Sequence, residues 1–206
     1  GTHSGTDVAN YSITLATANT YVVSPKAITY SIAAGAITYG ASHTAGAVTY
    51  DSLETDDVVS ATAQIDSVLL STANKIKAGT YAQSLNGTHS GTDVANYSIT
   101  LATANNYVVS KKALSVTSIA SVTATYGDSI SNGSVTFANA ETGDLVSVIA
   151  SIVSATYSTS SNLEAGTYNQ ITGDTSDLTG DDAANYTLIA ATHANSLTVS
   201  PKAITY

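Results

Sequence analysis

Residues 87–110 read GTHSGTDVANYSITLATANNYVVS, and residues 1–24 repeat this stretch with one difference, Thr20 in place of Asn106. A third, more diverged copy, GDDAANYTLIAATHANSLTVS, covers residues 180–200. The Asn-Tyr pairs at 10–11, 96–97 and 185–186 therefore recur at spacings of 86 and 89 residues. A repeat of this length is large enough to hold its own small core, so the sequence predicts tandem modules that each fold as a bead.

The hexapeptide PKAITY marks where each module begins. It occupies residues 25–30 and returns at 201–206, and KKAL at 111–114 holds the same place between them. The chain then divides into the C-terminal part of a preceding repeat at 1–25, module 1 at 26–111, module 2 at 112–201, and the first strand of a following repeat at 202–206. We therefore expect the chain to be a window of a longer tandem array.

The local pattern of apolar residues has a period of two. YSITL at 11–15 alternates strictly, and VTF at 135–137 and LTV at 197–199 do the same. Such runs place apolar side chains on one face of a strand, and Val, Ile, Thr and Tyr suit a half-buried pleated surface. We therefore predict an all-β fold, with β-grasp-like or β-sandwich-like modules arranged end to end.

Three local features carry further expectations. The β-branched runs at 53–70 and 145–155 favour long strands over helices. The Asn-Gly pairs at 86–87 and 132–133 are typical of hairpin turns. Short helical turns capped by Asp are an alternative to coil at 7–10 and 181–185.

The composition excludes several classes of function. All 6 Lys+Arg residues are lysines and the net charge is −9, so nucleic acid is not an expected partner, because phosphate binding needs dense Lys and Arg. The chain has no Cys, which excludes disulfides and thiolate chemistry. No stretch approaches the roughly 18 apolar residues of a membrane span, so membrane insertion is not expected.

The order of short motifs resembles a known family. A Tyr-Gly-x turn at 39–41 and 126–128 is followed by Ala-Gly-Thr-Tyr, Asp-x-Ala-Asn-Tyr and a closing Val-Ser-Pro-Lys-Ala. This order resembles the MBG and YDG-type repeats of large bacterial surface proteins, including filamentous-haemagglutinin-like adhesins. No Tyr-Asp-Gly occurs, which favours the Tyr-Gly-x form. The resemblance implies a mostly-β module in tandem on a secreted fibre or adhesin, without catalytic residues.

The histidines do not point to catalysis. His3 and His89 occupy the same repeat position, each with an Asp four residues later, Asp7 and Asp93. Triad residues converge through the fold rather than along one loop, and the third copy has Leu178 at the histidine position. We therefore expect no enzyme.

Acidic side chains cluster in two loops. Calcium prefers several carboxylate and carbonyl oxygens from one loop, so the alternative to a solvated acidic surface without any cofactor is a calcium site at a module junction. The candidate ligands are Asp174, Asp177, Asp181, Asp182, Asp56 and Asp57.

The recurring tyrosines and the chain ends suggest two kinds of contact. Tyrosines at fixed module positions are expected to fill the core and bond their hydroxyls to nearby backbone; a sugar-stacking face is the alternative. The end segments hold strands without the rest of a module, and an unpaired strand edge is a template for another chain. The candidate assembly residues are Tyr11, Ile13, Leu15, Tyr21, Val23, Ile204 and Tyr206.

Together these features favour a structural repeat of an extracellular bacterial adhesin or biofilm-matrix filament at the cell surface. It would act as a stalk, with other copies of itself as partners, assembling head-to-tail or as a continuous array. The alternative is an adhesion module that binds glycans or mucin directly.

Overall fold

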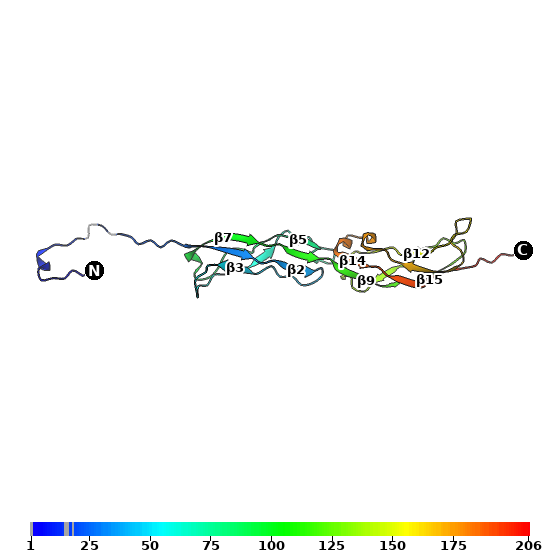
Figure 1. Cartoon of the computed structure of the whole chain (residues 1–206), viewed down its shortest axis with the longest axis horizontal. Coiled ribbons are helices and arrows are strands. Elements are labelled where there is room, and N and C mark those ends of the chain that lie inside the picture. The colour runs from blue at the N-terminus through cyan, green and yellow to red at the C-terminus, as the bar shows by residue number, and fades with distance from the viewer. Residues whose placement is uncertain (1, 15–16, 18) are drawn as a thin grey trace.

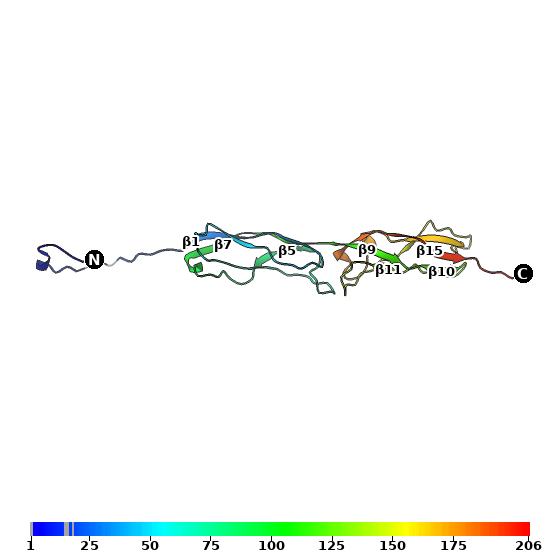
Figure 2. The same cartoon turned by 90° about the horizontal axis from the view of Figure 1, so that it is seen from below.

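The computed structural model describes residues 2–14, 17 and 19–206. The chain is elongated, with residues 26–111 and 112–201 following each other along the long axis and the two termini at opposite ends (Figure 1). The view turned by 90° shows the same end-to-end arrangement (Figure 2). We call these two parts module 1 and module 2.

The described residues contain strands and short 3₁₀ turns only, which confirms the all-β prediction. The strands of module 1 are β1 Lys26–Ile32, β2 Gly35–Thr38, β3 Val48–Asp51, β4 Ala63–Ile65, β5 Gly79–Tyr81, β6 Gln83–Leu85, β7 Tyr97–Ala104 and β8 Tyr107–Ser110. Those of module 2 are β9 Lys112–Ile119, β10 Val122–Thr125, β11 Val135–Phe137, β12 Ser151–Val153, β13 Gly166–Ile171, β14 Tyr186–Ile189 and β15 Thr192–Ser200. The 3₁₀ turns are η1 Val8–Asn10, η2 Val94–Asn96, η3 Thr175–Asp177 and η4 Ala183–Asn185.

Each module combines small sheets, which are mixed except for the antiparallel pair β4-β6, and the strand order in module 2 follows that in module 1. In module 1 the sheets have the orders β3-β1-β7, β2-β8-β5 and β4-β6, and in module 2 the orders β11-β9-β14 and β10-β15-β13-β12. A parallel pairing runs from Lys26 beside Tyr97 to Thr38 beside Ser110, so the first and last parts of module 1 lie side by side. Each of these strand pairs lies within a single module, and none joins the two modules.

The predicted long strands at 53–70 and 145–155 are wrong. These segments hold only β4 and β12 and are otherwise irregular. Asp56, Ser67 and Ser154 have positive φ angles of 70°, 50° and 54°, and a residue in that region bends the chain out of an extended strand.

The Asn-Gly pairs do not form two-residue hairpin turns either, since both lie in irregular segments. Gly133 serves a close approach instead, because a Cβ there would meet the carbonyl oxygen of Ala120 at 1.9 Å. Short helical turns, the alternative to coil at 7–10 and 181–185, occur as the 3₁₀ turns η1 and η4, but the Asp side chains do not cap them. The Asp182 side chain bonds other groups instead, as described below.

Tyrosines form much of the core, as predicted. Tyr39, Tyr107 and Tyr186 are among the largest fully buried side chains. Tyr81 and Tyr168, at equivalent repeat positions, donate to the carbonyls of Lys77 (2.7 Å) and Glu164 (2.9 Å). The ring fills the core and the hydroxyl is satisfied by backbone four residues earlier, the arrangement expected of buried Tyr.

A buried glutamine holds the same place in each module. Gln170 is fully buried; its Oε1 accepts from the Gly133 amide at 2.7 Å, and its Nε2 lies 3.3 Å from the Ala120 carbonyl oxygen and 3.2 Å from that of Ser196. Gln83 bonds Gly46, Ala33 and Asn105 in the same way. Each glutamine joins three chain segments and leaves no amide atom unpaired.

The strands predicted in the two end segments are absent from their described residues, which are exposed, although the same sequences form strands elsewhere in the chain. Tyr21 is 93% exposed, while its repeat counterpart Tyr107 is 1% exposed; Ile204 is 89% exposed and its counterpart Ile28 only 4%. Tyr11, Ile13, Val23 and Tyr206 are exposed as well, and Leu15 lies outside the described residues. The described part of the chain has no helix long and apolar enough to cross a membrane.

Candidate functional site at the junction between the modules

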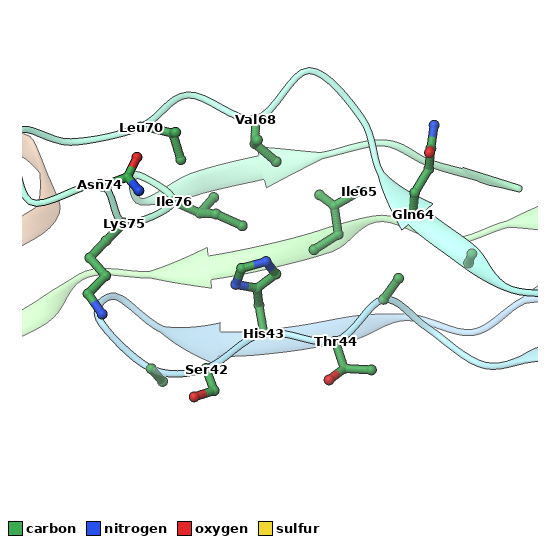
Figure 3. Close-up of a pocket in the computed structure, with 13 residues that line it drawn as sticks. Ser42, His43, Thr44, Gln64, Ile65, Val68, Leu70, Asn74, Lys75 and Ile76 are labelled. Atoms are coloured by element: carbon green, nitrogen blue, oxygen red, sulfur yellow. The ribbon is translucent and has the colours of Figure 1, made fainter. Parts of the chain in front are cut away.

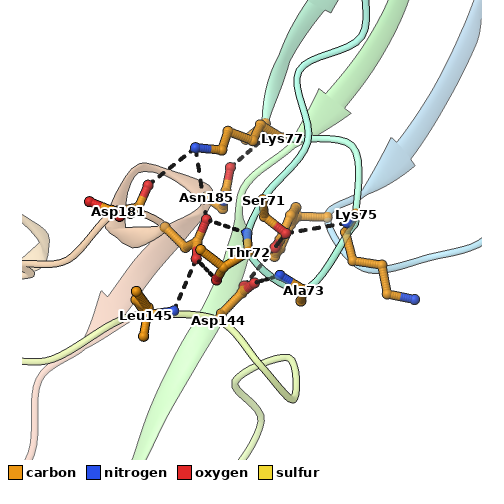
Figure 4. Close-up of polar contacts among 12 residues, drawn as sticks. Ser71, Thr72, Ala73, Lys75, Lys77, Asp144, Leu145, Asp181 and Asn185 are labelled. Atoms are coloured by element: carbon orange, nitrogen blue, oxygen red, sulfur yellow. Dashed lines mark hydrogen bonds and ion pairs between the residues drawn. The ribbon is translucent and has the colours of Figure 1, made fainter.

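The junction is a polar contact around Asp182, which lies just before η4 of module 2. Its side chain is fully inaccessible and accepts from the Thr72 amide (3.3 Å), the Thr72 hydroxyl and the Leu145 amide (2.9 Å) (Figure 4). The Lys77 ammonium lies 3.8 Å from it. Because a buried carboxylate is costly unless paired and hydrogen-bonded, Asp182 requires the Thr72 loop of module 1.

The acidic group at Asp182 is held in its charged form. Burial raises the pKa of its carboxyl, but the hydrogen bonds from Thr72 and Leu145, together with the Lys77 charge, lower the pKa more. The pKa therefore lies below its ordinary value. The hydrogen bonds and the Lys77 charge at the junction therefore favour the ionised carboxylate of Asp182 over the neutral carboxylic acid.

Asp144 is the second carboxylate at the junction. Its Oδ2 accepts from the hydroxyls of Tyr39 of module 1 (2.6 Å) and Tyr186 of module 2 (2.7 Å), and its Oδ1 from the Ala73 amide (3.2 Å). Burial and the bond to Asp144 raise the pKa of both phenols well above 10. Asp144 therefore binds neutral phenols from both modules at once.

The apolar core continues through the junction. One cluster of buried side chains contains Tyr39, Ile76 and Val109 of module 1 together with Leu114 and Tyr186 of module 2. A second cluster, around Leu197 and Val199 of β15, lies within module 2. The modules are therefore packed against each other by apolar burial as well as by hydrogen bonds.

The connection between the modules is short and braced. β8 ends at Ser110 and β9 begins at Lys112, so Lys111 alone separates the strands. Lys112 forms an ion pair with Glu141. A Cβ on Gly40 would meet Glu141 Oε1 at 2.2 Å, so this glycine, with φ of +89°, lets module 1 approach the ion pair closely.

Asn185 at the end of η4 is also covered by module 1. It is 1% exposed, and its Oδ1 accepts from the Ala78 amide at 2.9 Å. Its Nδ2 has no partner among the described residues. Lys77 Nζ donates to the Asp181 carbonyl oxygen at 3.3 Å. This is a further hydrogen bond between the two modules.

The six candidate calcium ligands are distributed over three places. Asp174 and Asp177 form a reciprocal capping box on η3, and Asp181 is exposed. Asp182 lies in the junction, and Asp57 accepts from Tyr97 in module 1, next to Asp56. Within the part of the chain that the structure describes, no group of three or more His, Cys, Asp or Glu is arranged to hold a metal.

His89 belongs to an aromatic cluster. Its Nδ1 lies 2.8 Å from the Tyr50 hydroxyl, and its ring packs edge-on against Tyr30 at 4.9 Å. Burial lowers the pKa of the imidazole. Asp93 does not reach this ring; it accepts from the Val58 amide at 2.8 Å. The side chains of His89 and Asp93 therefore make separate contacts, although they lie in the same loop.

Each module also has a groove at an equivalent position. The groove of module 1 has a volume of about 690 Å³, and Figure 3 shows the His43 ring between Ile65, Ile76 and Lys75. The groove of module 2 has a volume of about 470 Å³ and includes the exposed Tyr157. Their shared position shows that the groove is a product of the fold, while its lining differs between the modules.

Sequence reasoning included Asp182 for a different role and missed Tyr39, Thr72 and Asp144 as junction residues. The signal that would have found them is the repeat itself, because Asp144 and Tyr186 stand at the repeat positions of Asp57 and Tyr97. A scan against models of protein families found none that matches this chain, and no curated protein is significantly similar to it.

Proposed function

We propose that this chain is a stalk segment of an extracellular bacterial adhesin or matrix filament, in which tandem β modules act as a stiff spacer. The observation that carries the proposal is the junction, where Asp182 and Asp144 of module 2 are closed by Thr72, Ala73 and Tyr39 of module 1. A one-residue linker and an apolar core that continues through the junction resist bending, which is what a stalk needs.

The surface composition supports this proposal. Charged residues make up only 10% of the chain, with a net charge of −9, and a chain with so few cations binds polyanions poorly. The resemblance to MBG and YDG-type repeats supports the location at a bacterial cell surface and the absence of an enzymatic role.

The sequences of the two terminal segments support assembly with further copies. In β1 and β7, Ile28 pairs with Ile99 in a parallel register. The segments at 202–206 and 11–14 carry the same sequences as these strands and are exposed. Residues 202–206 of one copy therefore have the side chains to pair in parallel with residues 11–14 of another.

A spin-label distance measurement tests the stalk. The chain has no cysteine, so Thr49→Cys on β3 and Thr123→Cys on β10 place one label on each module at exposed positions. We expect a single narrow distance distribution. The same pair combined with Asp182→Ala and Tyr39→Phe should give a broadened distribution; a broad distribution without these changes would contradict the stalk function.

Direct glycan binding is the second candidate, supported by the repeated groove and by exposed Tyr157 in its wall in module 2. Aromatic faces are suitable surfaces for the apolar side of a sugar. Titration with glycan mixtures followed by amide NMR should then shift signals of Ile152 and Leu163, and Tyr157→Ala should abolish the shifts. Absence of shifts at millimolar glycan would remove this candidate.

A further inference from the structure

The groove of module 1 has the size and the mixed wall of a site for a small polar ligand. It lies between the loop at 41–45, β4 and the turn at 68–76. Its volume of about 690 Å³ falls within the usual range of ligand sites, about 300–1,000 Å³. Apolar side chains such as Ile65 and Ile76 form part of the wall, and its hydroxyl and amide groups come from Ser42, Thr44, Gln64 and Asn74.

The basic side chains of this groove have no acidic neighbour in its wall. His43 and Lys75 line the groove and no Asp or Glu does, and Figure 3 shows the His43 ring projecting into it and Lys75 at one end. Asp66, which follows β4, accepts from Gln64 at 3.1 Å and from Ser84 at 2.7 Å. The ion pairs of the described residues use other lysines, Lys26, Lys77 and Lys112. The groove therefore carries an unpaired positive charge in a chain whose net charge is −9.

Backbone contacts fix the turn that carries Lys75. Leu70 and Ile76 form an antiparallel bridge across this turn, and the Ser71 amide donates to the Lys75 carbonyl at 2.8 Å. Ile76 is buried, with 6% of its surface exposed. The Lys75 side chain therefore extends from a fixed backbone position, which reduces the ordering that a ligand must impose.

The loop that carries His43 is held at both ends. The Ala41 amide donates to the Thr38 carbonyl at 3.1 Å, and the Gly46 amide donates to Oε1 of the buried Gln83 at 2.6 Å. An imidazole has one N–H donor in each neutral tautomer and two when it is protonated. The His43 ring therefore has a donor for an anion in the groove in every one of these states.

The equivalent groove of module 2 has the opposite charge. Repeat positions in the two grooves differ by 87 residues, as Ile65 and Ile152 show. At this spacing three lining positions change their chemistry: Ala41 becomes Asp128, His43 becomes Ile130 and Lys75 becomes Asn162. The positive charge is therefore a property of these side chains of module 1 and not of the shared fold.

We propose that the groove of module 1 binds a sugar that carries a carboxylate, such as the uronate unit of an acidic polysaccharide. The Lys75 ammonium and a His43 N–H bind the carboxylate, since hydrogen bonds to an ionised partner are stronger than neutral ones. Ser42, Thr44 and Asn74 bind the ring hydroxyls. An acidic peptide offers a carboxylate but few hydroxyl groups, so the hydroxyl and amide lining favours the sugar.

Amide NMR titration of the full chain with sodium glucuronate at neutral pH tests the proposal. We expect saturable shifts of the His43, Ile65 and Ile76 signals, with a dissociation constant of about a few millimolar. Glucose, which has the same ring without the carboxylate, should leave these signals in place. No saturable shift with glucuronate would overturn the proposal. Equal shifts with acetate or with the peptide Gly-Glu-Gly would also overturn it, because the site would then take any carboxylate.

Two substitutions bring the module 2 residues into the groove of module 1. Lys75→Asn and His43→Ile should each raise the dissociation constant about fivefold or more, because each removes a donor to the carboxylate. Lys111→Asn, the matched control, makes the same charge change at an exposed position outside the groove and should leave binding unchanged. Equal weakening by Lys75→Asn and Lys111→Asn would show that only the net charge matters and would reject the site.

The reverse exchange tests the same chemistry without changing module 1. Asp128→Ala combined with Asn162→Lys gives the groove of module 2 the charge of its counterpart, and glucuronate should then shift the Ile152 and Leu163 signals, which it leaves in place in the wild type. The inference is independent of the stalk function, which the spin-label distances report. It is also separate from glycan binding at Tyr157, which neutral glycans report, so failure of glucuronate binding leaves both of those proposals standing.

Discussion

The rings of Tyr39 and Tyr186 meet edge to face across the junction, with centroids 5.3 Å apart and planes at 78°, and both hydroxyls donate to the same oxygen, Asp144 Oδ2. Each tyrosine comes from a different module. The pair therefore links the apolar cores of the two modules and the hydrogen bonds across the junction at one place. Loss of either hydroxyl should destabilise both modules.

Tyr39→Phe removes a buried hydroxyl that bonds a carboxylate. We expect the free energy of unfolding to fall by about 1.5–3 kcal/mol, the usual worth of a hydrogen bond to a charged group. Tyr126→Phe is the matched control, because its hydroxyl lies 3.4 Å from Ser160 at an exposed contact, and it should cost less than about 0.5 kcal/mol. Urea denaturation measures both; equal losses would contradict the assigned role of Tyr39.

Asp182→Asn should change how stability depends on pH. The folded pKa of this carboxyl lies below its ordinary value of 3.8, so the charged group stabilises the fold above that pH, and this stabilisation is lost as the pH falls through the folded pKa. The variant should lack this acid-dependent part and be less stable by about 1–3 kcal/mol at pH 7. Thermal unfolding between pH 2 and about 7 measures it.

Asp93→Asn is the control for that experiment. Asp93 occupies the same repeat position in module 1, where it is half-buried and accepts from the amide of Val58 and the hydroxyl of Thr92. It should therefore keep most of the wild-type pH dependence and stability. A larger loss for Asp93→Asn than for Asp182→Asn would show that the junction does not depend on the buried carboxylate.

Gln170→Leu should be strongly destabilising. The change leaves the Gly133 amide and the carbonyls of Ala120 and Ser196 without partners in the core, and each unpaired buried group costs about 1–3 kcal/mol. Gln64→Leu, on an exposed strand surface, should change the free energy of unfolding by less than about 0.5 kcal/mol. Calorimetry compares them, and similar midpoints would reject the bridging role of Gln170.

His89→Leu should remove part of the pH dependence of the stability of module 1. Burial lowers the pKa of this imidazole below 6.5, so the unfolded chain takes up the proton first, and stability falls as the pH drops from about 6.5 to the folded pKa. Leu178 stands at this position in module 2. Thermal midpoints at several pH values should flatten in His89→Leu but not in His3→Leu, which changes an exposed residue.

Amide hydrogen exchange should show different protection for two segments of nearly identical sequence. Peptides containing Thr20 or Asn106 differ in mass, so amides near Tyr21 and Tyr107 are measured separately. We expect the exposed N-terminal segment to exchange about a thousandfold or more faster than its buried counterpart in β8. Equal protection would mean that residues 1–24 have packing partners in solution.

The alternating patterns were enough to predict the all-β class. The strands β1 and β9 begin at Lys26 and Lys112, the residues at which the repeats divide the sequence. The burial of the recurring tyrosines in the core was also predicted. Alternating burial along a strand depends on neighbours within that strand, which the sequence shows directly. The long strands at 53–70 failed because positive φ angles at single Ser and Asp residues override the β propensity of their neighbours.

The sequence by itself determined the all-β class, the 86-residue to 89-residue spacing and the identity of the repeated side chains. The tertiary structure alone decided that Tyr107 is buried while Tyr21 is exposed, and that Asp182 is fully buried against Thr72 while Asp93 is half-buried. The physical reason is that burial belongs to a strand and its partners together. Identical residues therefore reach different environments according to which strands and loops lie beside them.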